Sequence, residues 1–169
     1  NVKRTLKPGG TLVLQGYTPK QLEYRTGGPP HVSHLYTEAL LRLVTRGGTG
    51  EGERATAHGH PTSAVSDEAP YVGGVLSGEQ SNTSIVFRAG EAWMPIIVKV
   101  FRQLHAGVNP DIELQTGLAT ARSPFVPGAI GSVSGEWPHP ATGFKVEGSL
   151  AFAQEFLPGV RDGWSIALA

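Results

Sequence analysis

The stretch PIIVKVFRQL, residues 95–104, carries the strongest strand signal in the chain, because β-branched residues and a phenylalanine follow one another without a turn residue. Lys99 stands in the middle of this apolar run. By strand alternation, its neighbours on the same face are Ile97 and Phe101. An unpaired charge in such surroundings is costly, so an anionic group is expected near Lys99. The alternative is an edge strand from which Lys99 faces solvent.

A helix is predicted directly downstream, in NPDIELQTGLATAR (residues 109–122). Asn109 is an N-cap residue type, and Pro110 occupies the first helical position, where its missing N–H is harmless. Glu113 lies early in this helix, and a helix packed across the sheet could bring its carboxylate to Lys99. The alternative role for Glu113 is a favourable interaction with the helix dipole, worth about 0.3–1 kcal/mol.

Uncharged polar residues lie just upstream, where the strand TSIVFRA (residues 83–89) begins. They are Gln80, Ser81, Asn82, Thr83 and Ser84. Residues of these types form ordinary hairpin turns. A polar turn between two strands, followed by a strand lysine and a helix glutamate, is also the arrangement with which kinases bind ATP phosphates. Both interpretations of the turn stay open.

The fold class expected for residues 71–169 is α+β, with an antiparallel sheet and one helix. Three further stretches have the composition of strands: YVGGVL (71–76), FVPGAIGSVSGEW (125–137) and GSLAFAQEFLPG (148–159). Residues 1–46 hold a strand pattern at 11–17 and a helical pattern at 35–44. Residues 47–70 contain Val65 as their only large aliphatic residue, which predicts a flexible linker.

The bulk composition narrows the classes of partner. The chain has 169 residues, 39% of them apolar, with 14 basic against 14 acidic side chains and no cysteine. Disulfides and thiolate metal sites are excluded. His58 and His60 lack a third ligand, so no metal site is expected there. Without a basic stripe or an apolar run of membrane-spanning length, we expect a cytoplasmic protein with no nucleic-acid or membrane partner.

Three separated motifs resemble a known family. SGEQSNTSIVF, IIVKVFRQLHAGVNPDIELQTGLA and SLAFAQEFLPGVRDGWSIALA closely resemble the N-terminal lobe of actinobacterial maltokinases and related aminosugar kinases. These enzymes are similar in fold to aminoglycoside phosphotransferases and protein kinases. The resemblance covers roughly Val72 to Ala169, and it implies a kinase-like N-lobe that binds ATP.

The resemblance also implies roles for individual residues. The turn from Gln80 to Ser84 would cover the phosphates, with Ser81, Asn82 and Thr83 donating to the β- and γ-phosphates. Lys99 would contact the α- and β-phosphates, and Glu113 would orient Lys99. The run 154–157 would be the hinge, whose backbone groups at Glu155 and Leu157 face the adenine edge.

The catalytic and metal-binding aspartates of that family lie in a C-terminal lobe, and so does its sugar site. No catalytic residue and no metal ligand is therefore assigned to this chain. ATP would act with Mg²⁺, and a sugar acceptor would bind, only together with that lobe. We expect the chain alone to be inactive.

The first segment has a resemblance of its own. LKPGGTLVLQGYTPKQLEYRTGGPPHVSHLYTEALLR, in residues 1–46, looks like the late part of a class I S-adenosylmethionine-dependent methyltransferase. The glycine-rich cofactor loop of those enzymes has no match here, so no cofactor binding is expected from it. The segment stands where maltokinases carry an amino-terminal cap, either as a fused fragment or as a substitute cap. Two alternative functions stay open: a noncatalytic, self-associating scaffold fragment, and a methyltransferase remnant.

Overall fold

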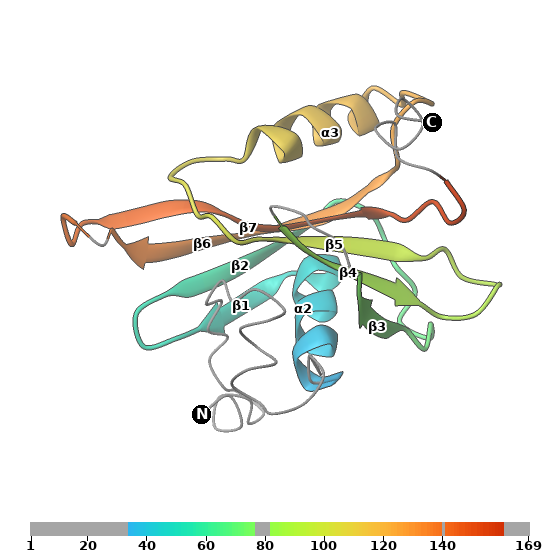
Figure 1. Ribbon diagram of the computed structural model, residues 1–169, viewed down its shortest axis with the longest axis horizontal. Coiled ribbons are helices and arrows are strands. Elements are labelled where there is room, and N and C mark those ends of the chain that lie inside the picture. The colour runs from blue at the N-terminus through green and yellow to red at the C-terminus, as the bar shows by residue number, and fades with distance from the viewer. Residues whose placement is uncertain (1–33, 77–81, 140, 161–169) are drawn as a thin grey trace.

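The computed structural model describes residues 34–76, 82–139 and 141–160, which form one antiparallel sheet with a helix on each face (Figure 1). The strand order is β1-β2-β6-β7-β5-β4-β3. The helices are α2 (His34–Arg46) and α3 (Pro110–Thr120). The strands are β1 (Gly48–Glu51), β2 (Thr56–Pro61), β3 (Val72–Val75), β4 (Asn82–Arg88), β5 (Ile96–Phe101), β6 (Ala129–Pro138) and β7 (Lys145–Glu155). This architecture agrees with the α+β class expected from the sequence.

Most local predictions are confirmed. The five strands expected after residue 70 occur as β3 to β7, and the helical pattern at 35–44 occurs as α2. The start of α3 is also as expected. The side chain of Asn109 accepts a hydrogen bond of 2.9 Å from the backbone N–H of Asp111, and Pro110 is the first helical residue. The strand expected at residues 11–17 lies outside the described residues.

The expectation of a flexible linker over residues 47–70 is wrong for residues 48–61. This stretch forms β1 and β2, and β2 pairs with β6 along its whole length, from Thr56 opposite Glu136 to Pro61 opposite Gly131. Strand pairing satisfies backbone groups and needs no large side chain. Position 59 requires glycine, because a Cβ there would lie 1.9 Å from the carbonyl oxygen of Leu43 in α2.

The main core lies between α2 and the sheet. Leu40 and Val44, one helical turn apart, are fully buried in α2. They contact a cluster drawn from both halves of the sheet: Ala57, Ile85, Phe87, Ile96, Val98, Val100, Ile130, Val133, Leu150, Ala151 and Ala153. Burial at the edge of this cluster raises the pKa of Tyr36 to about 12. The helix of the first predicted segment therefore shares one core with the strands of the last, and no boundary at residue 46 separates them.

A smaller cluster lies on the opposite face, which we call the α3 face. It contains Phe101, Ile112, Ala129 and Phe152. Ile112 is the one buried residue of α3, so this helix packs less extensively against the sheet than α2 does.

Neither of the two described helices is long and apolar enough to cross a membrane.

Candidate functional site

The residues of β5 alternate between the two faces of the sheet. Ile96, Val98 and Val100 belong to the main core under α2. Strand alternation therefore directs Ile97, Lys99 and Phe101 to the α3 face, and Phe101 does belong to the cluster beneath α3. Lys99 is half-buried. The sequence prediction of a lysine in an apolar stripe is thus confirmed.

The sheet register gives Lys99 its nearest neighbours. Ser84 in β4 and Phe152 in β7 lie directly opposite Lys99, one on each side. Directly opposed residues share a face, with Cβ atoms about 4.5–5.5 Å apart. Ser84 is only 4% exposed. A hydroxyl, an ammonium and an aromatic ring therefore form a row across three strands on the α3 face.

The polar turn is described only in part. Gln80 and Ser81 lie outside the described residues, whereas Asn82, Thr83 and Ser84 are the first residues of β4. The carbonyl oxygen of Asn82 accepts a hydrogen bond of 3.2 Å from the guanidinium of Arg102. Thr83 lies opposite Val100, whose side chain is in the main core, so Thr83 faces away from Lys99. Of the described turn residues, Asn82 and Ser84 share the face of Lys99.

Lys99 and Glu113 lie on the same side of the sheet but form no ion pair. Ion pairs within the described residues are Glu38–Arg42, Asp67–Arg46 and Glu136–Lys145. Glu113 is exposed because the neighbouring Ile112 is the residue that α3 buries against the sheet. Successive helical residues point about 100° apart, so Glu113 turns toward the surface.

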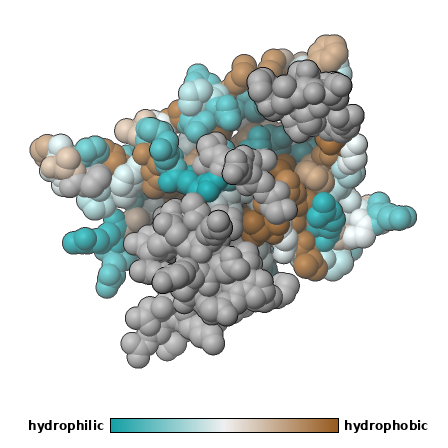
Figure 2. All heavy atoms as spheres, in the orientation of Figure 1, coloured by the Kyte–Doolittle hydropathy of each residue, from teal (hydrophilic) through white to brown (hydrophobic). Residues whose placement is uncertain are grey.

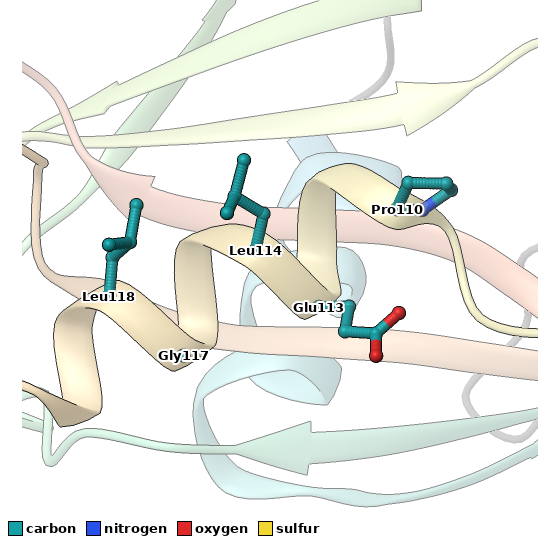
Figure 3. A pocket seen from close by; sticks show the side chains of 5 residues that line it. All are labelled: Pro110, Glu113, Leu114, Gly117 and Leu118. Carbon is teal, nitrogen blue, oxygen red and sulfur yellow. The ribbon is translucent and has the colours of Figure 1, made fainter.

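A hollow of about 480 Å³ lies on the outer side of α3 and is lined by Pro110, Glu113, Leu114, Gly117 and Leu118 (Figure 3). In the close view, Leu114 and Leu118 lie on one side of the helix and the Glu113 carboxylate on the other. Brown and teal atoms are mixed along the top of Figure 2, where α3 lies. Leu114 is 62% exposed. All five lining residues come from α3, so this hollow is separate from the row around Lys99.

The segment expected to be a hinge, residues 154–157, spans the end of β7. Glu155 forms two hydrogen bonds with Gly128. Its backbone N–H donates to the Gly128 carbonyl (2.9 Å), and its carboxylate Oε2 accepts from the Gly128 N–H (3.0 Å). Leu157 is 49% exposed. The N–H of Glu155 is thus occupied within the protein, while Leu157 lies at the surface.

Sequence reasoning missed Arg88, the last residue of β4. Its guanidinium lies 5.2 Å from the centre of the Phe156 ring, which follows the end of β7. A cation over an aromatic face is attractive. Arg88 is four residues after Ser84 in the same strand, so both residues lie on the α3 face. The alternation along TSIVFRA could have predicted this.

The histidines of β2 are ordered rather than part of a linker. His58 and His60 point to one face, where the His60 Nε2 lies 2.8 Å from the Ser134 hydroxyl and the His58 Nδ1 lies 3.3 Å from the Thr49 hydroxyl. Within residues 34–76, 82–139 and 141–160, no three His, Asp or Glu side chains are grouped so that they could hold a metal ion. No metal site is assigned.

A comparison with protein-family models found no match for this chain. The arguments for a function therefore come from the residues and their geometry.

Proposed function

We propose that the α3 face of strands β3 to β7 is the ATP-binding N-lobe of a sugar phosphotransferase that acts on maltose or an aminosugar. The observation that supports this proposal most is the order β7-β5-β4 in the sheet. It brings the strand of the polar turn, the strand of Lys99 and the strand that ends in the 154–157 segment side by side.

The spacing along β5 suits an extended ligand. Asn82, where the turn meets β4, lies opposite Phe101, and Glu155 lies opposite Ile96. At a rise of about 3.3 Å per residue, the α-carbon of Lys99 is about 7 Å from that of Phe101 and about 10 Å from that of Ile96. A nucleotide lying along the strand would present its phosphates to Lys99 and the turn, and its base to the 154–157 segment.

The charge of Lys99 favours an anionic ligand. Lys99 is half-buried, and its ammonium has no carboxylate within ion-pair distance in the described part of the chain. Phosphate oxygens would supply the missing counter-charge. Mg²⁺ bound with the nucleotide would neutralise part of the phosphate charge. The described residues do not provide a three-ligand site of their own for it.

The role proposed for Glu113 requires a change in α3. Its carboxylate is exposed, so α3 would have to rotate about its axis before Glu113 could orient Lys99. The light packing of α3, which buries Ile112 alone, is compatible with such a rotation. The sugar acceptor and the residue that receives its proton are assigned to a following lobe, as the resemblance implies.

The substitution Lys99→Ala tests this proposal. Wild-type protein should bind Mg·ATP in calorimetric titration, and Lys99→Ala should weaken that binding about tenfold or more, because a charge-assisted phosphate contact is lost. Lys145→Ala is the matched control, since Lys145 is exposed and pairs with Glu136 at the other end of β7. It should change the affinity less than about twofold. An absence of binding by the wild type, or equal binding by Lys99→Ala, would contradict the proposal.

The outer side of α3 favours a second candidate function, a noncatalytic interaction module that self-associates. Leu114 on α3 is 62% exposed, and Phe125 in the turn that follows the helix is 92% exposed. Such apolar surface is stabilised when a partner covers it. Under this alternative, light scattering should give a mass that rises with protein concentration, and Leu114→Glu should remove the rise. A monomer mass at every concentration would exclude it.

A further inference from the structure

The sheet has two open edges, β1 and β3, each paired with one neighbour among the described residues (Figure 1). The outer side of an edge strand presents backbone groups without partners, and proteins commonly protect such edges with charged side chains. β1 carries Glu51. β3 and the residue that follows it, VGGVL (72–76), carry no charge. The edge of β3 is therefore the less protected of the two.

The hydrogen bonds of the sheet show which residues of β3 point outward. Opposed residues of an antiparallel pair alternate between hydrogen-bonded and non-hydrogen-bonded positions. The N–H of Leu76 donates to the Ser84 carbonyl (2.9 Å), so the even-numbered residues of β3 bond to β4. The N–H and C=O groups of Gly73 and Val75 therefore point away from β4. In the part of the chain that the structure describes, these outward groups have no hydrogen-bond partner.

Two exposed apolar side chains flank this edge on the α3 face. Val72 is 59% exposed and Leu76 is 37% exposed. Gly74 lies between them on the same face, and a Cβ there would meet no atom within 4 Å. Val75 points the other way and packs against the main core. The β3 edge thus combines unbonded backbone groups with apolar surface and open space at its middle.

We propose that the β3 edge is a dimerisation surface, on which the β3 strand of a second copy of this chain adds in antiparallel orientation. In the register that places Gly74 opposite Gly74 of the second copy, Gly73 lies opposite Val75. The outward backbone groups of each copy then bond those of the other, with two hydrogen bonds in every such pair. Val72 lies opposite Leu76 of the second copy, and the two exposed side chains cover each other on both sides of the axis.

The composition of the edge favours a second copy as the occupant. Because VGGVL carries no charge, the segment can face itself without like charges meeting across the axis. A two-fold contact uses the same edge on both copies and closes after two chains. Pairing of β3 with β1 of another copy would instead leave a free edge at each end and produce open chains. The inference concerns the edge strand alone and does not rest on nucleotide binding.

The substitution Gly74→Lys tests the proposal by sedimentation equilibrium. A contact of this size is small, so wild-type protein should pass from monomer to dimer between about 10 µM and 1 mM. Gly74→Lys should raise the dissociation constant about tenfold or more, because two ammonium groups would lie directly opposite each other at the axis. Gly50→Lys is the matched control on the other edge, where a Cβ meets only that of Ala57, at 4.0 Å. It should change the dissociation constant less than about twofold.

A charge-pair mixture tests the register itself. Gly74→Glu alone should be monomeric for the same reason as Gly74→Lys. An equimolar mixture of the two variants should recover dimers that contain one copy of each, because a lysine then lies opposite a glutamate. A loss of dimer caused by misfolding would not be recovered by mixing. A mixture that stays monomeric therefore overturns the proposed register.

The remaining outcomes are equally decisive. A wild-type chain that stays monomeric up to about 1 mM overturns the second copy as the occupant of this edge. An unchanged dissociation constant in Gly74→Lys places any dimer contact elsewhere. Leu114→Glu should leave the dimer intact, since Leu114 lies on α3. Loss of the dimer in that variant would assign self-association to the outer side of α3 and overturn the inference.

Discussion

Gly59→Ala is expected to lower the free energy of unfolding by about 3 kcal/mol or more. The new Cβ would lie 1.9 Å from the carbonyl oxygen of Leu43 and 2.8 Å from its carbonyl carbon. Both are backbone atoms of α2, so no side-chain rotation can relieve the overlap. The helix and β2 would have to separate, which opens the main core. For a chain of this size the thermal midpoint should fall by about 6–12 °C.

The matched control is Gly50→Ala in β1, the strand that pairs with β2. A Cβ at Gly50 meets only the Cβ of Ala57, at 4.0 Å, so this variant should stay within about 0.5 kcal/mol of wild type. Thermal unfolding of both variants measures the difference. If Gly59→Ala unfolds like wild type, β2 does not lie under α2, and the interpretation of residues 47–70 as a linker would be restored.

Phe152→Ala is expected to destabilise the chain by about 3–5 kcal/mol, the usual range for removing a buried aromatic ring. Phe152 is 1% exposed and lies opposite both Lys99 and Ser132, at the centre of the α3 face. Its ring belongs to the small cluster that holds Ile112 of α3. The cavity should therefore loosen α3 as well as the sheet.

Chemical denaturation measures this effect, with Phe144→Ala as the control. Phe144 is 76% exposed and its truncation should change the unfolding free energy by less than about 0.5 kcal/mol. Hydrogen exchange in α3 should become faster in Phe152→Ala than in the control. Equal stability of the two variants would mean that the cluster beneath α3 contributes little to the fold.

The elements with strong local signals could be predicted from the sequence. The apolar run of β5 and the Asn109-Pro110 start of α3 each encode their structure within a few residues. The strands β1 and β2 could not be found in this way. Their glycine, threonine and alanine residues carry no hydrophobic run, and the pairing that stabilises β2 comes from β6, about 75 residues later in the chain.

The candidate site could also be predicted only in part from the sequence. Strand alternation correctly gave the face of Lys99, because a period of two has only two solutions. The orientation of Glu113 could not be read in the same way. Apolar and small residues occur all around α3, so the sequence does not say which side meets the sheet, and Ile112 rather than its neighbour takes that place.

Alternate residues of β5 face opposite layers of the fold. Ile96, Val98 and Val100 face the layer that keeps the chain folded, while Ile97 and Lys99 face the opposite layer. Under the proposed function, substitutions at Ile97 and Lys99 would change ligand binding without opening the interior beneath α2. Changes at Lys99 should then cost less stability than changes at Phe101, which belongs to the buried cluster beneath α3.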